Sequence, residues 1–177
     1  MARSDARARA RRTSAPVERT PAGDALSLFA VQVLRLAGLL IETGDALAAP
    51  AGQTSARWRV LAMVEHGSAT VATIARTLGQ ARQSVQRVAD LLAAHGLAEF
   101  DDDPDDKRAM RLRLTARGRA TLRKIQAAQR VWADAVGAEI GERQLRAAST
   151  TLARVTDSVA RGEDENQSAH APRSRGS

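Results

Sequence analysis

The stretch from Leu78 to Phe100, LGQARQSVQRVADLLAAHGLAEF, constrains the fold more than any other part of the chain. Its apolar residues recur at helical spacing, so that one face of a helix can be buried: Val85, Val88, Leu91 and Leu92. The opposite face, toward the N-terminal end, is polar and acid-free: Gln80, Arg82, Gln83, Ser84, Gln86 and Arg87. Because arginine and glutamine hydrogen-bond to base edges, we expect this helix to enter the major groove of DNA.

A shorter predicted helix comes directly before it. Thr70 is placed to start this helix and Gly79 to end it, and the DNA-facing helix then begins near Ala81 and ends at His95 and Gly96. Two short helices joined by a tight turn that contains glycine, the second with a polar N-terminal face, form the helix-turn-helix pattern.

Residues 97–114 predict a β-hairpin. Residues 97–100 are a short apolar strand, and the second strand alternates apolar side chains with Arg111 and Arg113: Met110, Leu112 and Leu114. Between the strands lies a polar turn, DDDPDDKRA, whose tip holds Lys107 and Arg108. A hairpin directly after a helix-turn-helix is a wing, so we expect these basic residues to face a neighbouring minor groove or phosphate backbone.

Longer helices flank this region. The first, capped by Asp24 and running over about 25–48, has two apolar stripes, which predicts a helix buried between its own domain and a partner subunit. Thr115 is placed to cap another, over about 116–138. The last, over about 142–161, has apolar residues at heptad a/d spacing, which we assign to subunit pairing: Leu145, Ala148, Leu152, Val155 and Val159.

The predicted fold is mainly α, a winged helix-turn-helix domain with a two-stranded wing and a helical dimerisation region. The folded domain covers 23–161, with a DNA-binding core at about 54–115 and dimerisation helices at about 24–48, 116–138 and 142–161. We expect disordered tails at 1–22 and 162–177. The first tail holds six arginines against two acids, and both a role in attracting DNA phosphates and no role at all remain open for it.

Composition excludes several classes of function. The chain has no cysteine, which rules out disulfides, thiol redox sensing and cysteine-bound zinc. No P-loop or HExxH motif occurs, and the acidic turn lacks the glycine and glutamate that a calcium loop needs, so we expect no enzyme, no cofactor and no metal. No apolar run approaches the roughly 20 residues of a membrane span, so a cytoplasmic protein without a membrane partner is expected.

Several segments resemble the multiple antibiotic resistance regulator (MarR) family. They are RWRVLAMVEHG, TIARTLG, QSVQRVADLLAAHGLAEF and, above all, DPDDKRAMRLRLTARG. The last contains the wing signature of the family, Asp-Pro, then Asp-x-Arg, then Leu-Thr-x-x-Gly, with correct spacing. The resemblance covers about residues 24–161.

The resemblance implies a homodimer, joined through the first, fifth and sixth helices, that binds double-stranded DNA as a transcriptional regulator, here expected to be a repressor on a pseudo-palindromic operator. It implies that Arg108 enters the minor groove and that Asp106 pairs to hold the wing. It places Arg82, Gln83, Ser84, Gln86 and Arg87 in the major groove. It also implies a phenolic or lipophilic small-molecule effector, whose contact residues the sequence does not identify. The alternative is a winged-helix module that binds protein and not DNA, against which the acid-free helix face argues.

One position departs from the family. The residue before the DNA-facing helix is often serine or threonine, and here it is Ala81, which costs roughly 0.5–2 kcal/mol of capping energy. Either Gln80 supplies the cap or the helix start stays open until a DNA phosphate binds it. For Trp58 and Trp132 we favour packing over contact with a ligand, and for His66 and His95 a helix C-terminus over a ligand pocket.

Overall fold

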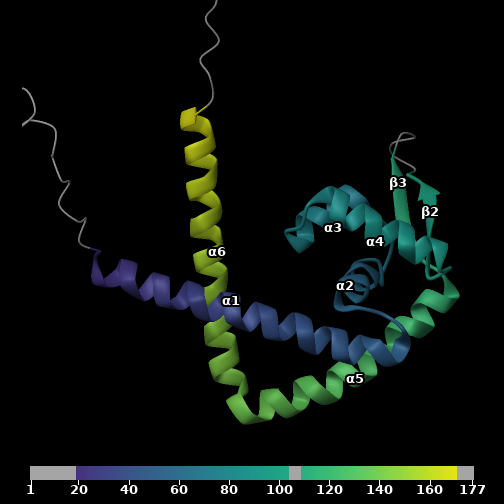
Figure 1. Cartoon of the computed structure of the whole chain (residues 1–177), viewed down its shortest axis with the longest axis horizontal. Coiled ribbons are helices and arrows are strands. Elements are labelled where there is room, and N and C mark those ends of the chain that lie inside the picture. The colour runs from purple at the N-terminus through teal and green to yellow at the C-terminus, as the bar shows by residue number, and fades with distance from the viewer. Residues whose placement is uncertain (1–18, 104–108, 171–177) are drawn as a thin grey trace, which may run out of the picture.

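The computed structural model describes residues 19–103 and 109–170 and confirms the mainly α winged helix-turn-helix fold. Three long helices, α1, α5 and α6, form a frame, and the small winged lobe sits at one end of it (Figure 1). In chain order the elements are α1 (Pro21–Ala48), the 3-10 helix η1 (Ala49–Ala51), α2 (Ser55–Met63), β1 (Ala69–Thr70), α3 (Val71–Leu78), α4 (Arg82–Ala94), β2 (Ala98–Asp102), β3 (Met110–Leu114), α5 (Ala116–Ile140) and α6 (Glu142–His170).

The helix-turn-helix consists of α3 and α4, with ends close to those predicted. Thr70 is the N-cap of α3, where its hydroxyl accepts from the Thr73 backbone N–H at 3.2 Å. Gly79 ends α3 in the left-handed region, at φ 61°, which glycine adopts without a steric penalty. These two local signals therefore set the length of α3 and the turn that leads into α4.

The wing belongs to a three-stranded antiparallel sheet in the order β1-β3-β2. Phe100 lies opposite Leu112 on the β2–β3 pair, and Ala69 lies opposite Leu112 on the β1–β3 pair. The sequence predicted only the hairpin of β2 and β3. The strand β1 has just two residues, too few to show an alternating pattern.

The hydrophobic core lies mainly within the winged lobe and the first part of α5, and Ala48 at the end of α1 is also buried. It contains fully buried side chains from each of the main elements of the lobe, among them Leu61, Ile74, Val85, Leu92, Leu112 and Leu122. Two predicted core positions are wrong: Leu91 is 45% exposed and Met110 is 46% exposed. Met110 lies at the outer end of the hairpin, opposite Asp102, where the strand has run past the core.

The helix α5 packs directly on the backbone at the start of β2. A Cβ on Gly118 would lie 1.8 Å from the carbonyl oxygen of Leu97, so only glycine fits there. The Thr115 hydroxyl accepts from the Gly118 N–H at 3.0 Å and donates to the Gly96 carbonyl at 2.8 Å. The Leu-Thr-x-x-Gly segment thus joins the wing to α5 through close contact, which explains the residue types.

The end of α1 is tied to the start of α2 by Asp45. Its carboxylate accepts from the Ser55 backbone N–H at 2.6 Å. This bond, with smaller contributions from the Ser55 hydroxyl and the Arg59 charge, lowers the pKa of Asp45 below its ordinary value of 3.8. Gly44 makes room for the contact, because a Cβ there would lie 2.9 Å from Cβ of Ser55.

The ends of two helices differ from prediction. Thr20, and not Asp24, caps α1 by accepting from the Gly23 N–H at 3.1 Å, and Pro21 follows at the first helical position, where proline is favoured. Residues 19–22, predicted as tail, therefore belong to this capped start. The helix α6 continues through Gly162 to His170 because the residues after the glycine include good helix formers and no proline. The rest of both predicted tails lies outside the described residues.

The helix α1 is more apolar than the sequence prediction allowed. By length and composition alone, the segment Pro21–Ala51 could cross a membrane, with a mean hydropathy of 1.7 over its most apolar window. The sequence prediction concerned unbroken apolar runs, which Arg35 and Glu42 interrupt in this segment. Apolar helices that pack against protein pass the same test.

Candidate nucleic-acid interface

The N-terminal half of α4 presents a polar, acid-free surface. Val85, Ala89 and Leu92 are fully buried and anchor the helix in the core. The side opposite them is exposed and has no acidic residue in its first turn: Arg82, Gln83, Ser84 and Arg87. The structure thus places four of the predicted DNA contacts together on one solvent-facing surface.

The start of α4 has no side-chain cap, as Ala81 predicted. The first helical bonds run from the N–H groups of Ser84 and Val85 to the Ala81 carbonyl, at 3.0 and 3.2 Å. Among the described residues, nothing accepts from the N–H groups of Arg82 and Gln83. A helix N-terminus with free N–H groups and no acidic neighbour favours a negatively charged ligand such as a phosphate.

Gln80 is occupied elsewhere. In the amide orientation that satisfies both groups, its side-chain oxygen accepts from the two terminal nitrogens of Arg59, at 3.0 and 3.2 Å. This contact ties the turn between α3 and α4 to α2. The possibility that Gln80 caps α4 is therefore wrong, and the helix start is open on the protein side.

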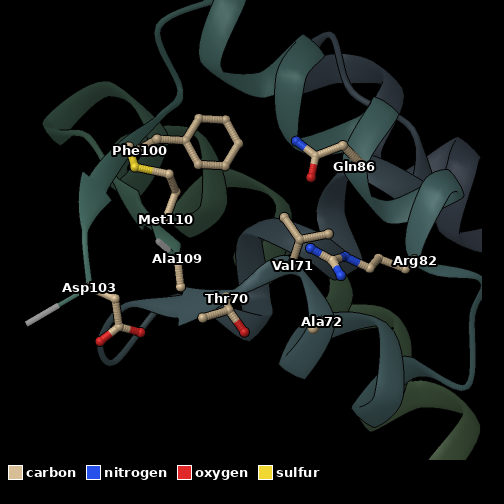
Figure 2. Close-up of a pocket in the computed structure, with 9 residues that line it drawn as sticks. All are labelled: Thr70, Val71, Ala72, Arg82, Gln86, Phe100, Asp103, Ala109 and Met110. Carbon is tan, nitrogen blue, oxygen red and sulfur yellow. The ribbon is translucent and has the colours of Figure 1, made fainter. Parts of the chain in front are cut away.

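A groove of about 570 Å³ separates α4 from the wing (Figure 2). Gln86 and Arg82 extend from α4 on one side, and Phe100 and Met110 stand on the wing opposite. The Gln86 amide nitrogen donates to Asp90 at 2.8 Å, which fixes the orientation of this side chain. The groove is open, and its lining includes Arg82 on α4 and Asp103 at the end of the wing strand.

The two arginines of β3 are held by carboxylates of β2 and of Asp103 just beyond it. Arg111 donates to the Ser68 carbonyl at 2.9 Å and lies 3.5 Å from the carboxylate of Asp103. Arg113 pairs with Glu99 at 2.9 Å and also with Asp101. Both arginines are therefore already paired with carboxylates of the hairpin, while Asp106 and Arg108 lie outside the described residues.

Sequence reasoning did not single out Asp103 or Arg59 as site residues. Asp103 is only 9% exposed and anchors Arg111, and Arg59 holds Gln80. The register of the hairpin could have indicated Asp103. Residues 102 and 110 lie opposite each other, so Asp103 lies just beyond the end of β2 and near Arg111. No comparable signal existed for Arg59, because its partner Gln80 lies in the turn between α3 and α4, 21 positions away in the chain.

The two tryptophans and two histidines singled out in the sequence lie at packing positions or at helix ends. Trp58 packs against the core, as its spacing predicted, and Trp132 is half-buried on α5. His95 is the C-cap of α4, and His66 lies 3.7 Å from Glu65 just beyond α2.

A second surface is apolar and lies away from α4. Except for Leu91 and Met110, all the exposed large hydrophobic residues in the described part of the chain lie on α1, α5 and α6. Leu34 is 73% exposed, Val131 73% and Leu28 70%. Neither predicted stripe of α1 is buried in the single chain, where only Gly44 and Ala48 of this helix are buried.

Comparison with known proteins agrees with this geometry. A family model described as the MarR family matches residues 51–109. An uncharacterized protein of Mycobacterium tuberculosis is 43% identical over 102 residues, which are 58% of this chain and 71% of that protein, and one from Mycobacterium bovis matches equally. The chain belongs to the MarR family of transcriptional regulators.

Solved structures share the fold, and some contain DNA or a ligand. The transcriptional repressor CouR bound to a 23-mer DNA duplex has a TM-score of 0.67 and 26% identity, over 78% of this chain and 99% of that one. The M. tuberculosis regulator MOSR in complex with DNA has a TM-score of 0.62 and 25% identity, over 73% and 96%. CouR from Rhodococcus jostii bound to p-coumaroyl-CoA has a TM-score of 0.66, with 19% identity over 72% and 90%, a likeness of fold only.

Proposed function

We propose that this protein is a sequence-specific transcription regulator that binds a pseudo-palindromic operator as a homodimer and represses transcription. The observation that supports it most is the exposed polar face at the N-terminal end of α4, which has no acidic residue in its first turn and lies beside the wing groove. The DNA-bound structures of CouR and MOSR, which have a similar fold, support DNA binding.

In this proposal α4 lies in the major groove. Arg87 donates to a guanine edge and Gln83 bonds to an adenine edge, pairings that discriminate bases by about 1–3 kcal/mol each. Ser84 and Gln86 lie beside them. The free N–H groups at the start of α4, together with Arg82, bind a phosphate, which supplies the missing cap.

The wing supplies the second contact. The family resemblance assigns Arg108 to the minor groove and Asp106 to holding the wing. For Gln80 and Arg111, expected earlier to touch DNA, the existing bonds to Arg59 and to Asp103 favour a positioning role, in which they orient the turn before α4 and the outer part of the wing hairpin.

The exposed apolar surface of α1, α5 and α6 pairs two copies, in keeping with the heptad spacing of α6. The division of the chain into dimerisation helices and a DNA-binding core is part of the proposal. Twofold symmetry then places the two α4 helices roughly 34–36 Å apart on one face of the DNA, which matches successive major grooves.

We further infer a cytoplasmic protein with no enzymatic activity, whose DNA binding is released by a phenolic or lipophilic effector. The p-coumaroyl-CoA complex of CouR supports an effector, and its contact residues in this chain are unassigned.

The test is fluorescence anisotropy with the upstream intergenic DNA of the protein's own gene and a shuffled duplex of the same composition. We expect at least roughly 1000-fold preference for the upstream DNA and a steep loss of affinity with salt. No binding to either duplex at low salt would instead favour the protein-interaction module. Equal binding to both would reduce α4 to a phosphate-binding surface.

A further inference from the structure

Arg59 on α2 contacts the turn that leads into α4, although it lies outside the α4 surface. Both terminal nitrogens of its guanidinium donate to the side-chain oxygen of Gln80, at 3.0 and 3.2 Å. The guanidinium is a rigid planar fork, so two bonds to one oxygen fix both the distance and the direction of that oxygen. The contact therefore fixes the Gln80 side chain relative to α2.

The turn has only one polar side chain that can hold its position. It consists of Gly79, Gln80 and Ala81, and of these only Gln80 has a polar side chain. The backbone of the turn is closed against α3, because the Gln80 N–H donates to the Ala75 carbonyl at 2.9 Å. Gln80 is thus the residue through which a side-chain hydrogen bond connects the turn to α2.

This turn sets the direction of the open start of α4. Ala81 is the N-cap residue, and its carbonyl accepts from the N–H groups of Ser84 and Val85, at 3.0 and 3.2 Å. The free N–H groups of Arg82 and Gln83 lie within the same helical turn, so a shift of Ala81 would change where they point. A fixed turn holds them ready for an anion, which lowers the ordering cost of binding.

Folding stability alone does not account for an arginine at position 59. Its Nε is buried without a hydrogen-bond partner, and no carboxylate of a described residue lies within 4 Å of the guanidinium. The Ser55 bond, and to a smaller extent the Arg59 charge, lowers the pKa of Asp45, so these two charges interact only at longer range. Partial burial of a charge without an ion pair is unfavourable, and an apolar side chain would avoid this cost. The position that the guanidinium imposes on Gln80 explains the arginine better.

We propose that Arg59 is a positioning residue for DNA recognition, which holds Gln80 and thereby directs the open N-terminus of α4 toward a DNA phosphate. The inference rests on the proposed DNA-binding function and adds to it a residue that does not itself touch DNA. Because Arg59 acts through Gln80, the loss of either partner should have the same consequence as the loss of both.

Amide hydrogen exchange of the full-length protein, followed by NMR without DNA, tests the contact itself. Arg59→Gln should speed exchange at the Ser84 and Val85 amides about tenfold, because the turn that carries their acceptor is released. Arg57→Gln is the matched control, since this arginine lies one turn away on α2 and has no ion pair with any described residue. Equal exchange in R59Q and wild type would overturn the proposal.

Phosphate-ethylation interference on the upstream intergenic DNA tests the consequence for binding. In the wild type, ethylation of the phosphate at the start of each α4 should block binding. In R59Q this interference should be lost selectively, with operator affinity about tenfold lower and the salt slope reduced by about one ion. R57Q should keep the wild-type pattern. An unchanged pattern in R59Q, or one weakened equally at every phosphate, would show a structural role only and overturn the proposal.

Two further variants separate the fork from the charge. Arg59→Lys keeps the charge and lacks the fork, so it should behave like R59Q; wild-type binding would overturn the proposal. Gln80→Ala should cause the same selective loss, with no further loss in R59Q/Q80A, and it replaces R59Q if that variant does not fold. Additive losses would contradict action through Gln80. If the wild type binds neither the upstream nor the shuffled duplex, the proposed function fails with this inference, whereas wild-type binding with an unchanged R59Q pattern refutes this inference alone.

Discussion

The winged lobe and the long-helix frame bury their apolar residues to very different extents. In the lobe, Ile74, Val85 and Leu92 are fully buried within one chain. On α1, Leu34 is 73% exposed and Leu28 70%, and this exposure continues over α5 and α6. Monomeric proteins rarely expose apolar patches larger than a few hundred Å². The difference shows that the core of the lobe is closed within one chain, and it supports the proposed pairing of the frame with a second copy.

The largest effect is expected where the two regions join. Gly118→Ala places a Cβ 1.8 Å from the Leu97 carbonyl, so α5 must move away from β2, at a cost of about 3 kcal/mol or more. Urea unfolding followed by circular dichroism measures the loss. The matched control is Gly162→Ala on α6, where nothing lies within 4 Å, and it should be neutral or stabilise by up to about 1 kcal/mol. Equal stabilities for the two variants would show that the join is not close-packed.

A charge on the frame should separate the subunits and leave the lobe folded. Leu34→Asp would bury an unpaired carboxylate twice in a symmetric interface, so we expect the dissociation constant of the dimer to rise at least ~100-fold, equivalent to about 2.8 kcal/mol. Light scattering after gel filtration measures the mass. Leu34→Met is the control and should remain dimeric. A Leu34→Asp protein that stays dimeric with unchanged affinity would place the interface elsewhere.

Changes on α4 should alter DNA preference without altering either region's fold. Arg87→Ala is expected to relax base preference by about 1–3 kcal/mol at one position of each half-site, and Gln83→Ala similarly at another. Competition binding with single-base variants of the operator measures this. A uniform loss across all sequences would demote these residues to phosphate contacts.

A change at the wing tip should have a smaller and less selective effect. Arg108→Ala is expected to lower affinity for all sequences and to reduce the slope of affinity against salt by about one ion. A salt titration of anisotropy measures both, with dimer mass as the control. Unchanged binding would show that the wing does not insert.

The smallest effect concerns pH and the contact of Asp45 with Ser55, which ties the end of α1 to the start of α2. The bond from Ser55 lowers the pKa of Asp45, so its stabilisation is present above the ordinary value of 3.8 and is lost as the pH falls through the lower folded value. Asp45→Asn should therefore be less stable than wild type at pH 6 and closer to it at pH 3. Unfolding in urea at the two pH values measures the difference in free energy of unfolding between wild type and Asp45→Asn. This difference should be smaller at pH 3 than at pH 6, and an equal difference at both would exclude this linkage.

Sequence predicted best what depends on local patterns. The ends of α3 and the uncapped start of α4 followed from Thr70, Gly79 and Ala81. The hairpin of β2 and β3 followed from alternation. The long helices were also recognised, because apolar periodicity extends over several turns.

What sequence could not predict depends on contacts between distant residues. The pair Gln80–Arg59 joins the α3–α4 turn to α2, the pair Ser55–Asp45 joins α2 to α1, and no spacing rule connects their members. The exposure of Leu91 depends on where the neighbouring elements end, which periodicity along one helix does not show. The sequence predicted the residues of the α4 surface, but only the structure shows which of them already hydrogen-bond within the protein.

Hydroxyl-radical footprinting of the wild type and Leu34→Asp on the upstream intergenic DNA tests the central claim most directly. A dimer that places two α4 helices in successive major grooves predicts two protected half-sites, roughly 34–36 Å apart on one face. In Leu34→Asp, with the lobe still folded, the protection of both half-sites should weaken together. Full protection by the monomeric variant, or protection that ignores sequence, would contradict the account.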